Sequence, residues 1–439
     1  MEAGPVVRTN QLDFDEEVIY KSTQYLYDHV RQRNEQPFCL TVSMTHPHDP
    51  YAMTKEFWDL YNDVEIPLPK NGAIPHDQQD AHSQRVLKCI DLFNKEMPDE
   101  RIRAARRAYY AACTYVDTNV GKLLRVLDNT GLADDTIIVF TGDHGDMLGE
   151  RGLWYKMTWF ENSARVPFLV HSPKHFAPKR VSENVSTMDL LPTFAELAGA
   201  KLISELPLDG VSLVPYLTGG EGLRTDTVYG EYMGEGTQAP LMMIRRGRWK
   251  FITSAIDPPM LFDLVNDPDE KVNLAAGLPI PSTRSITGKP TSLSSAVNLP
   301  TPNETPRASP IPQRATAANT DYPFPSPTPP RTPSPAKLPP ALPNTTDPAK
   351  ILAFFVEETN NRWDLEQIRQ DVLRSQRRRR LVYSALIQGT PSIWDYEPRV
   401  DPSTQYVRNQ GKGALDDVEL ISRWPRVLQQ AANANGLHT

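Results

Sequence analysis

A short apolar stretch that ends in a polar, glycine-rich turn is the feature that most constrains the fold of this 439-residue chain. Residues 136–140 read Thr-Ile-Ile-Val-Phe, a β-branched run of the length expected for a buried parallel strand. Residues 141–145 read Thr-Gly-Asp-His-Gly, which places Asp143 and His144 at the C-terminal end of that strand. Open α/β sheets bind ligands at this edge. The sequence therefore predicts a site where a carboxylate oxygen and an imidazole nitrogen serve one cation.

Helical and strand patterns alternate along the first part of the chain, which predicts an α/β protein. Helical periodicity covers 15–34, 101–127 and 188–199. Strands are expected at 38–44, 136–140 and 166–170, and the short strands of a smaller sheet at 227–232, 241–245 and 248–253. Prolines and polar residues between 66 and 98 predict a long surface excursion.

A segment dense in Pro, Ser and Thr interrupts the later part of the chain. Such a composition cannot bury enough apolar surface to offset the entropy of ordering. A disordered insertion and retained intron sequence are the favoured interpretations, and a polyproline II ligand for a partner domain is the functional alternative. The expected organisation is a catalytic α/β domain, a small sheet subdomain, the disordered insertion and a C-terminal extension, at 1–230, 231–276, 277–347 and 348–439.

Three separated blocks stand out: residues 45–51, residues 377–409, and residues 141–156, which run from Thr-Gly-Asp-His-Gly to Trp-Tyr-Lys. Together they resemble the sulfatases of the alkaline phosphatase superfamily, in the form found in choline sulfatases. Residues 141–156 resemble the second metal-binding motif of the family. Residues 45–51 resemble its sulfate-binding His loop, and residues 377–409 resemble its C-terminal extension. The resemblance implies a sulfatase fold, in which helices flank a central, mostly parallel sheet. A smaller C-terminal sheet and a helical C-terminal extension complete that fold.

Two features of the family are absent from the sequence. Sulfatases carry a Cys-x-Pro/Ala-x-Arg motif whose cysteine becomes the formylglycine nucleophile, and Cys39, Cys89 and Cys113 all lie in other contexts. The Asp-Asp pair that supplies two further metal ligands is also missing. The chain is therefore expected to be a sulfatase that has lost its beginning and to be inactive alone.

The resemblance assigns roles to residues in the two matching loops. Asp143 and His144 would bind a divalent metal ion, with Ca²⁺ favoured and Mg²⁺ or Mn²⁺ as alternatives. Lys156 would neutralise the sulfuryl oxygens, and His48 would donate a proton to the leaving oxygen. His46 is a second candidate for substrate contact. A structural loop histidine and a solvated lysine are the alternatives for His48 and Lys156.

Choline recognition requires aromatic faces and carboxylates, because a quaternary ammonium cannot donate hydrogen bonds. The candidate substrate-binding residues lie in two regions: Glu231, Glu235, Trp394, Asp416 and Asp417. Each of them has a plain structural role as its alternative. The expected reaction is hydrolysis of choline O-sulfate to choline and sulfate. A phosphonate or phosphate monoester hydrolase of the same superfamily and a non-catalytic pseudo-sulfatase that binds a partner are the two rivals.

Charge and composition bound the partners and the compartment. The net charge of −7 argues against a general nucleic-acid-binding surface, and the run Arg377–Arg380 is interpreted as a solvated basic stripe. No apolar run reaches the length needed to cross a bilayer, and the first residues lack the pattern of a signal peptide. Three cysteines without a disulfide framework fit a reducing compartment, so cytoplasm is expected. The resemblance further implies a homo-oligomer.

Overall fold

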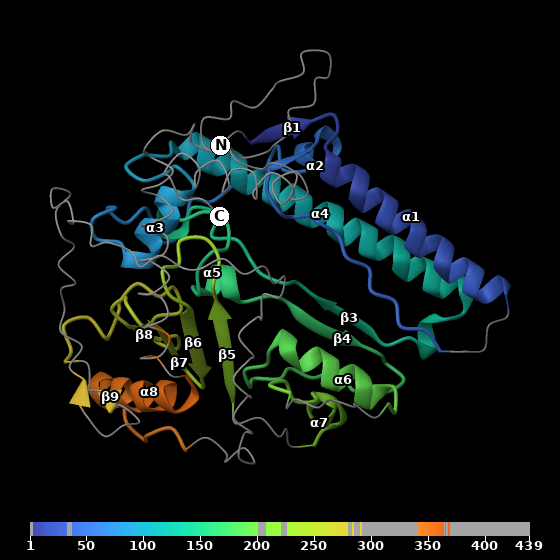
Figure 1. Ribbon diagram of the computed structural model, residues 1–439. Coiled ribbons are helices and arrows are strands. Elements are labelled where there is room, and N and C mark those ends of the chain that lie inside the picture. The colour runs from blue at the N-terminus through green and yellow to red at the C-terminus, as the bar shows by residue number, and fades with distance from the viewer. Residues whose placement is uncertain are drawn as a thin grey trace, which may run out of the picture.

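The computed structural model describes residues 3–32, 37–200, 208–220, 226–279, 283–284, 290–291 and 340–363, together with Leu365 and Ile368. The other residues are not described further. Several sequence predictions lie outside the described residues: most of the Pro-rich segment, the run Arg377–Arg380, Trp394, Asp416 and Asp417. The described part is mixed α/β (Figure 1).

Two long helices, α1 (Asn10–Arg31) and α4 (Asp99–Thr130), lie side by side (Figure 1). The Thr9 hydroxyl caps α1 by accepting a hydrogen bond from the Leu12 N–H at 3.1 Å, so the helix begins before its predicted start. Buried residues recur every three or four positions along α1, and the first and last of them, Leu12 and Leu26, belong to clusters that also contain α4 residues. Both predicted helices are confirmed.

The strand that precedes the Thr-Gly-Asp-His-Gly turn differs from its prediction. It forms β3 (Ile138–Thr141), and β3 pairs antiparallel with β4 (Phe168–His171), which was also predicted as a strand. Every residue of β3 is only half-buried. The prediction of a buried parallel strand is therefore wrong in direction and in burial. The direction differs because the strand beside β3 is β4, which runs antiparallel to it. The burial differs because β4 is the only strand paired with β3 among the described residues, so the other edge of β3 lacks a strand beside it.

The segment 38–44 was predicted as a strand, and it has no assigned strand structure. Its burial alternates along the chain, with Phe38 and Leu40 packed on the cluster that contains Leu26. The apolar alternation was recognised correctly, but no described strand pairs with this segment to make a ladder. The parallel pair in the described residues is β1 (Gly4–Val6) with β2 (Ala52–Thr54).

A four-stranded antiparallel sheet forms the second large unit, with its strands in sequence order. Its strands are β5 (Thr227–Tyr232), β6 (Leu241–Arg246), β7 (Trp249–Ser254) and β8 (Met260–Asp263). Helix α8 (Pro348–Arg362) packs on the sheet, where Phe355 stacks on Phe251 with ring centroids 5.6 Å apart. The three predicted strands are confirmed, and β8 was not predicted.

The predicted surface excursion at 66–98 contains a helix, α3 (Ala81–Cys89). Its face with His82, Ser83, Val86 and Leu87 is buried, so the prediction is wrong for this part. A nine-residue helix with two polar residues on its buried face gives little periodic signal. The remaining α-helices and strands of the described residues are α2 (Lys55–Asp59), α5 (Glu161–Ala164), α6 (Leu190–Leu197), α7 (Val214–Thr218), β9 (Thr283–Arg284) and β10 (Pro290–Thr291). Within the part of the chain that is described, no helix has the length and apolar character to span a membrane.

Candidate active site

The two loops predicted to carry the chemistry meet at His48 and Lys156. The Nε2 atom of His48 is in hydrogen-bond contact with Nζ of Lys156, although 108 positions separate the two residues. The Nδ1 atom of His48 lies 2.8 Å from the Asp49 carbonyl oxygen and 3.1 Å from the Asp49 carboxylate. Two acceptors at Nδ1 favour the tautomer with the proton there, which leaves Nε2 as the acceptor facing the lysine. His48 is one-third exposed, so a solute can reach it.

Asp143 and His144 follow β3 in the sequence, and His144 lies beside His48. The rings of His144 and His48 lie 5.9 Å apart. The His144 Nδ1 atom lies 2.9 Å from the Gly145 carbonyl oxygen, so its proton is held there and the lone pair of Nε2 remains available. That Nε2 atom lies 3.4 Å from Oδ2 of Asp143, whose side chain is 87% exposed.

These two donors fit part of a divalent-metal site. A carboxylate oxygen and a neutral imidazole nitrogen lie within a few ångströms of one another and face solvent. Calcium takes about six to eight oxygen ligands, and no group of three or more His, Cys, Asp or Glu residues in the described ranges is arranged to hold a metal ion. Asp143 and His144 could therefore hold a metal only together with further ligands.

Helix α5 holds the loop after β3, which carries Asp143 and His144, together with the segment that carries Lys156. The Gly145 N–H donates to the Ser163 carbonyl oxygen at 2.7 Å, and the Ser163 hydroxyl donates to the Lys156 carbonyl oxygen. A Cβ atom at position 145 would lie 2.1 Å from the Asn162 carbonyl oxygen, so only glycine fits there. Ser163 was not among the predicted site residues, because nothing in the sequence around it indicates these contacts.

The middle of the resembling motif, Glu150 and Arg151, packs the loop against other segments of the chain. The Glu150 carboxylate accepts hydrogen bonds from the N–H groups of Lys70 and Asn71 at 3.1 and 2.8 Å. The Arg151 guanidinium donates to the Glu270 carbonyl oxygen at 2.5 Å and lies over the Phe160 ring, 4.2 Å from its centroid. These residues tie the excursion after β2 to the body of the protein.

His46 lies away from solvent, at the other end of the His loop. Its side chain is 1% exposed, and its Nδ1 atom lies 2.6 Å from the Asp15 carboxylate. Its ring packs edge-on against Tyr115, and its Nε2 atom has no hydrogen-bond partner among the described residues. Burial alone would raise the pKa of Asp15, but hydrogen bonds from His46 and from the Thr45 and His46 amides outweigh it and lower that pKa. The substrate role of His46 stays a prediction.

The structure brings one of the two predicted carboxylates toward Lys156. Glu235 accepts a hydrogen bond from the Tyr232 hydroxyl at 2.9 Å. Its own backbone N–H, this hydroxyl and the charge of Lys156 together lower the pKa of Glu235, so it stays ionised. Glu231 instead accepts a 2.6 Å hydrogen bond from the indole of Trp363, next to the end of α8.

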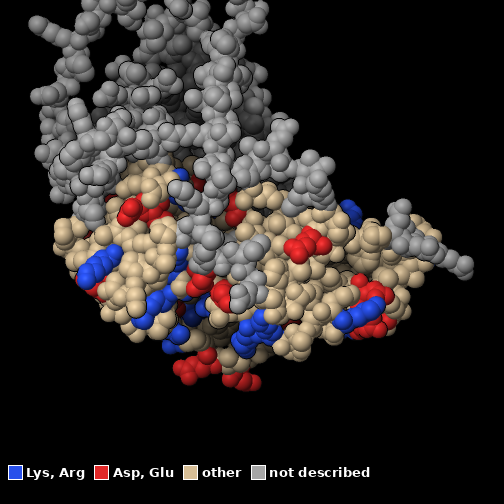
Figure 2. All heavy atoms as spheres, turned by 90° about the horizontal axis from the view of Figure 1, so that it is seen from below, with Lys and Arg blue, Asp and Glu red and all other residues tan. Residues whose placement is uncertain are grey.

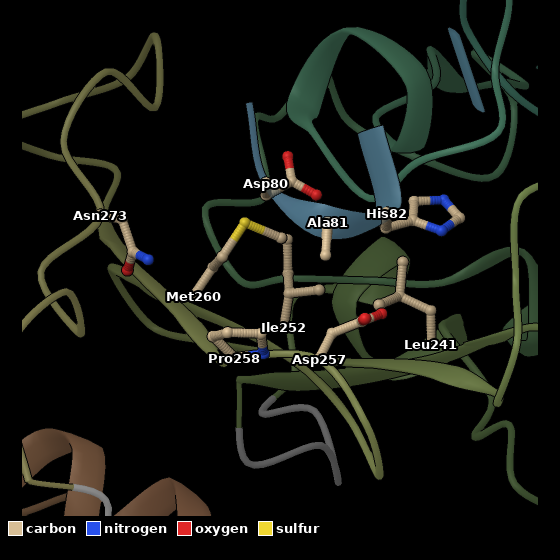
Figure 3. Close-up of a pocket in the computed structure, with 9 residues that line it drawn as sticks. All are labelled: Asp80, Ala81, His82, Leu241, Ile252, Asp257, Pro258, Met260 and Asn273. Atoms are coloured by element: carbon tan, nitrogen blue, oxygen red, sulfur yellow. The ribbon is translucent and has the colours of Figure 1, made fainter. Parts of the chain in front are cut away.

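A separate cavity of about 130 Å³ lies between α3 and the four-stranded sheet (Figure 3). Its lining comprises Asp80, Ala81, His82, Leu241, Ile252, Asp257, Pro258, Met260 and Asn273. Its carboxylates already have partners, since Asp257 pairs with Arg85 at 2.5 and 2.9 Å and Asp80 caps α3. None of the predicted site residues lines this cavity.

Charged side chains of both signs are interspersed on the face seen in Figure 2. The described residues on this face form no large basic patch of the kind that binds nucleic acid (Figure 2).

Three family models match the chain. The Sulfatase model matches residues 4–200, and the model for the C-terminal part of N-sulphoglucosamine sulphohydrolase matches residues 149–282. The model for the C terminus of the choline sulfatase enzyme matches residues 370–424, outside the described part.

Relatives and solved structures agree with these matches. Choline-sulfatase of Rhizobium meliloti is 39% identical over 428 residues, which are 97% of this chain and 70% of that protein. Arylsulfatase K of Gallus gallus is 34% identical over 269 residues, 56% of this chain and 49% of that protein. The chain thus spans about half the length of arylsulfatase K.

Two solved structures share the fold. A phosphonate monoester hydrolase from Silicibacter pomeroyi matches with a TM-score of 0.51 and 26% identity, covering 59% of this chain and 56% of that one. A 2-O GAG sulfatase matches with a TM-score of 0.52 and 22% identity, covering 63% of this chain and 61% of that one. The predicted sulfatase fold is confirmed. With this fold and the extensive match to the Rhizobium protein, the chain belongs to the choline sulfatase family of sulfatases.

Proposed function

We propose that His48, Lys156, Asp143 and His144 form the part of a choline O-sulfate hydrolysis site that binds the ester, and that the site together with its nucleophile would yield choline and sulfate. The observation that carries the proposal is the contact between His48 Nε2 and Lys156 Nζ beside the ring of His144. It puts a fixed positive charge, a proton carrier and a carboxylate–imidazole pair around one solvent-facing point. Hydrolysis of a sulfate ester requires these groups, because negative charge stays on the sulfuryl oxygens while the leaving oxygen needs a proton.

Each side chain has a distinct task in this proposal. The Lys156 ammonium binds the sulfuryl oxygens as a compact positive charge. His48 keeps one proton at Nδ1, where the Asp49 carbonyl oxygen accepts it, and its Nε2 atom is the acceptor for Lys156. When Lys156 turns to the sulfuryl oxygens, Nε2 can take up a proton from solvent and pass it to the bridging oxygen as the sulfur–oxygen bond breaks. Asp143 and His144 would hold a divalent metal ion, and calcium is our proposal. When bound, that ion would neutralise further charge on the sulfate.

The choline end of the substrate is assigned to Glu235. Its carboxylate is kept ionised near Lys156 and lies on the loop after β5, so it can attract the quaternary ammonium while the lysine holds the sulfate. Glu231 has a partner in Trp363, which weakens its candidacy. Roles for Trp394, Asp416 and Asp417 stay predictions.

The nucleophile is missing from this scheme. None of the three cysteines lies in a Cys-x-Pro/Ala-x-Arg motif, so we propose that the 439 residues bind choline O-sulfate without turning it over. A second candidate, phosphonate monoester hydrolysis, is favoured by the Silicibacter pomeroyi structure. The much wider match to the Rhizobium protein favours the sulfate ester. A homo-oligomer and a cytoplasmic location complete the proposal.

The test compares choline O-sulfate, 4-nitrophenyl sulfate and a phenyl phosphonate monoester, with binding followed by saturation-transfer NMR and turnover by product release. We expect choline O-sulfate to bind best, Lys156→Met to weaken it by about tenfold or more, and Lys174→Met, a surface lysine beside Asp135, to change nothing. Stronger binding of the phosphonate ester would replace the substrate assignment. Turnover of choline O-sulfate by this chain would overturn its inactivity.

A further inference from the structure

Helix α1 holds the first part of the His loop through a single buried carboxylate. Asp15 is 0% exposed and accepts three hydrogen bonds from that loop. The donors are the Thr45 N–H at 2.6 Å, the His46 N–H at 3.0 Å and the His46 imidazole at Nδ1, 2.6 Å away. Because each donor belongs to the loop, the carboxylate fixes both the backbone and the imidazole at the start of the loop.

Helix α1 also holds the far part of the loop, through a side chain that lies four positions before Asp15. Gln11 Nε2 donates to the Asp49 carbonyl oxygen at 2.6 Å. This carbonyl is also the oxygen 2.8 Å from Nδ1 of His48. The side chain of Gln11 is therefore linked to the His48 imidazole through one atom, on the side of the ring opposite Lys156.

We infer that Asp15 and Gln11 are positioning residues, which fix the loop 45–50 so that His48 Nε2 meets Lys156. The inference deepens the proposed function and depends on it only for the chemical role of His48. The hydrogen bonds of both side chains go to Thr45, His46 and Asp49 and not to His48 or Lys156, so both act through the loop.

The chemistry of position 15 requires a carboxylate. An ionised carboxylate only accepts hydrogen bonds, so it holds the His46 proton at Nδ1 and satisfies two backbone N–H groups together. An asparagine has the same shape, but its NH₂ group would face one of these donors. A buried donor without an acceptor is costly, so the loop should loosen locally.

Asp13 provides the matched control on the same helix. Its side chain is 51% exposed and contacts Arg8, so Asp13→Asn removes the same charge from α1 without touching the His loop. The experiment measures amide hydrogen exchange at Thr45 and His46, and the side-chain ¹⁵N resonances of His48. The amide of Phe251 in β7 reports whether the fold is intact.

We expect Asp15→Asn to speed exchange at Thr45 and His46 by about tenfold or more, to shift the His48 resonances and to leave Phe251 protected in a folded β7. Asp13→Asn should change none of the three. An intact β7 with unchanged loop exchange and unchanged His48 resonances would overturn the inference. If Asp15→Asn loses protection at Phe251, Gln11→Met decides instead, with a shift at His48 in support and no shift against. Because turnover is not measured, the experiment still tests the positioning role if the proposed function is wrong.

Discussion

The four-stranded sheet and the β3–β4 pair differ in how fully their strands are buried. All residues of β7 and β8 are buried, whereas no residue of β3 is. Lys250 in β7 is 1% exposed and is matched by Glu161 at 2.6 Å and Glu270 at 2.9 Å. Asp143, just after β3, is 87% exposed. We therefore expect β7 and β8, with α8, to contribute more to stability than the open edge at β3 where the candidate chemistry lies.

The largest expected effect is a cavity in the small sheet. Phe251 is 1% exposed and stacks on Phe355 of α8, so Phe251→Ala should lower the free energy of unfolding by about 3–5 kcal/mol. Leu169 in β4 is 61% exposed, and Leu169→Ala should change it by less than about 0.5 kcal/mol. Urea unfolding measures both. Equal losses would break the comparison between the two regions.

Loss of the buried charge of Lys250 should lower the free energy of unfolding by nearly as much. Lys250→Met leaves Glu161 and Glu270 without their shared cation and should cost about 3 kcal/mol in unfolding free energy. Burial raises the pKa of Glu161, but the charge of Lys250 outweighs it and lowers that pKa, so the substitution should move it upward. Lys174→Met removes an exposed lysine paired with Asp135 and should leave stability unchanged. An unchanged free energy of unfolding for Lys250→Met would show that the ion pairs of Lys250 with Glu161 and Glu270 do not stabilise the core.

Acid should weaken the link between α1 and the His loop. The pKa of Asp15 in the folded protein is lowered from 3.8, so its contribution is complete above that pH and is lost as pH falls through the folded value. Unfolding free energies should therefore differ between the wild type and Asp15→Asn by about 2 kcal/mol at pH 6. The difference should shrink below pH 3.8. A difference that stays constant to lower pH would contradict the ionised state of Asp15.

The smallest effect on stability is expected from substitution of Asp143, in the loop after β3. Asp143→Asn alters an exposed side chain, so the thermal midpoint should not change. Calcium binding, followed by calorimetry, should weaken at least about tenfold because one ligand loses its charge. Asp135→Asn, another exposed carboxylate, serves as the control. Calcium binding that is insensitive to Asp143→Asn would place the metal elsewhere.

Local patterns in the sequence predicted the elements with strong periodicity. The helices α1, α4 and α6, and the strands β5, β6 and β7, lie where the pattern of apolar residues placed them. The pairing of β3 could not be predicted in this way, because strand direction depends on the neighbour and not on the residues of the strand itself. Short elements such as α3 and β8 carried too few apolar positions to stand out.

The candidate site was predictable as far as motifs reach. The loops around His48 and around Asp143 to Lys156 were recognised separately, and their contact follows from the fold. The residues that hold these loops, Asp15 and Ser163, could not be found from sequence. Asp15 reaches a loop 30 positions away, and Ser163 acts through its hydroxyl and backbone carbonyl, so neither contact leaves a local signal.

The most direct test of the account is an NMR titration of the chain with choline O-sulfate in the presence of calcium, with the side chains of His48, His144 and Lys156 observed. The account predicts that all three respond along one binding curve and that Lys156→Met moves the response of both histidines to at least about tenfold higher ester concentration while β7 stays protected. Resonances that shift independently, or that stay fixed in a folded chain at saturating ester, would show that these side chains do not form one site.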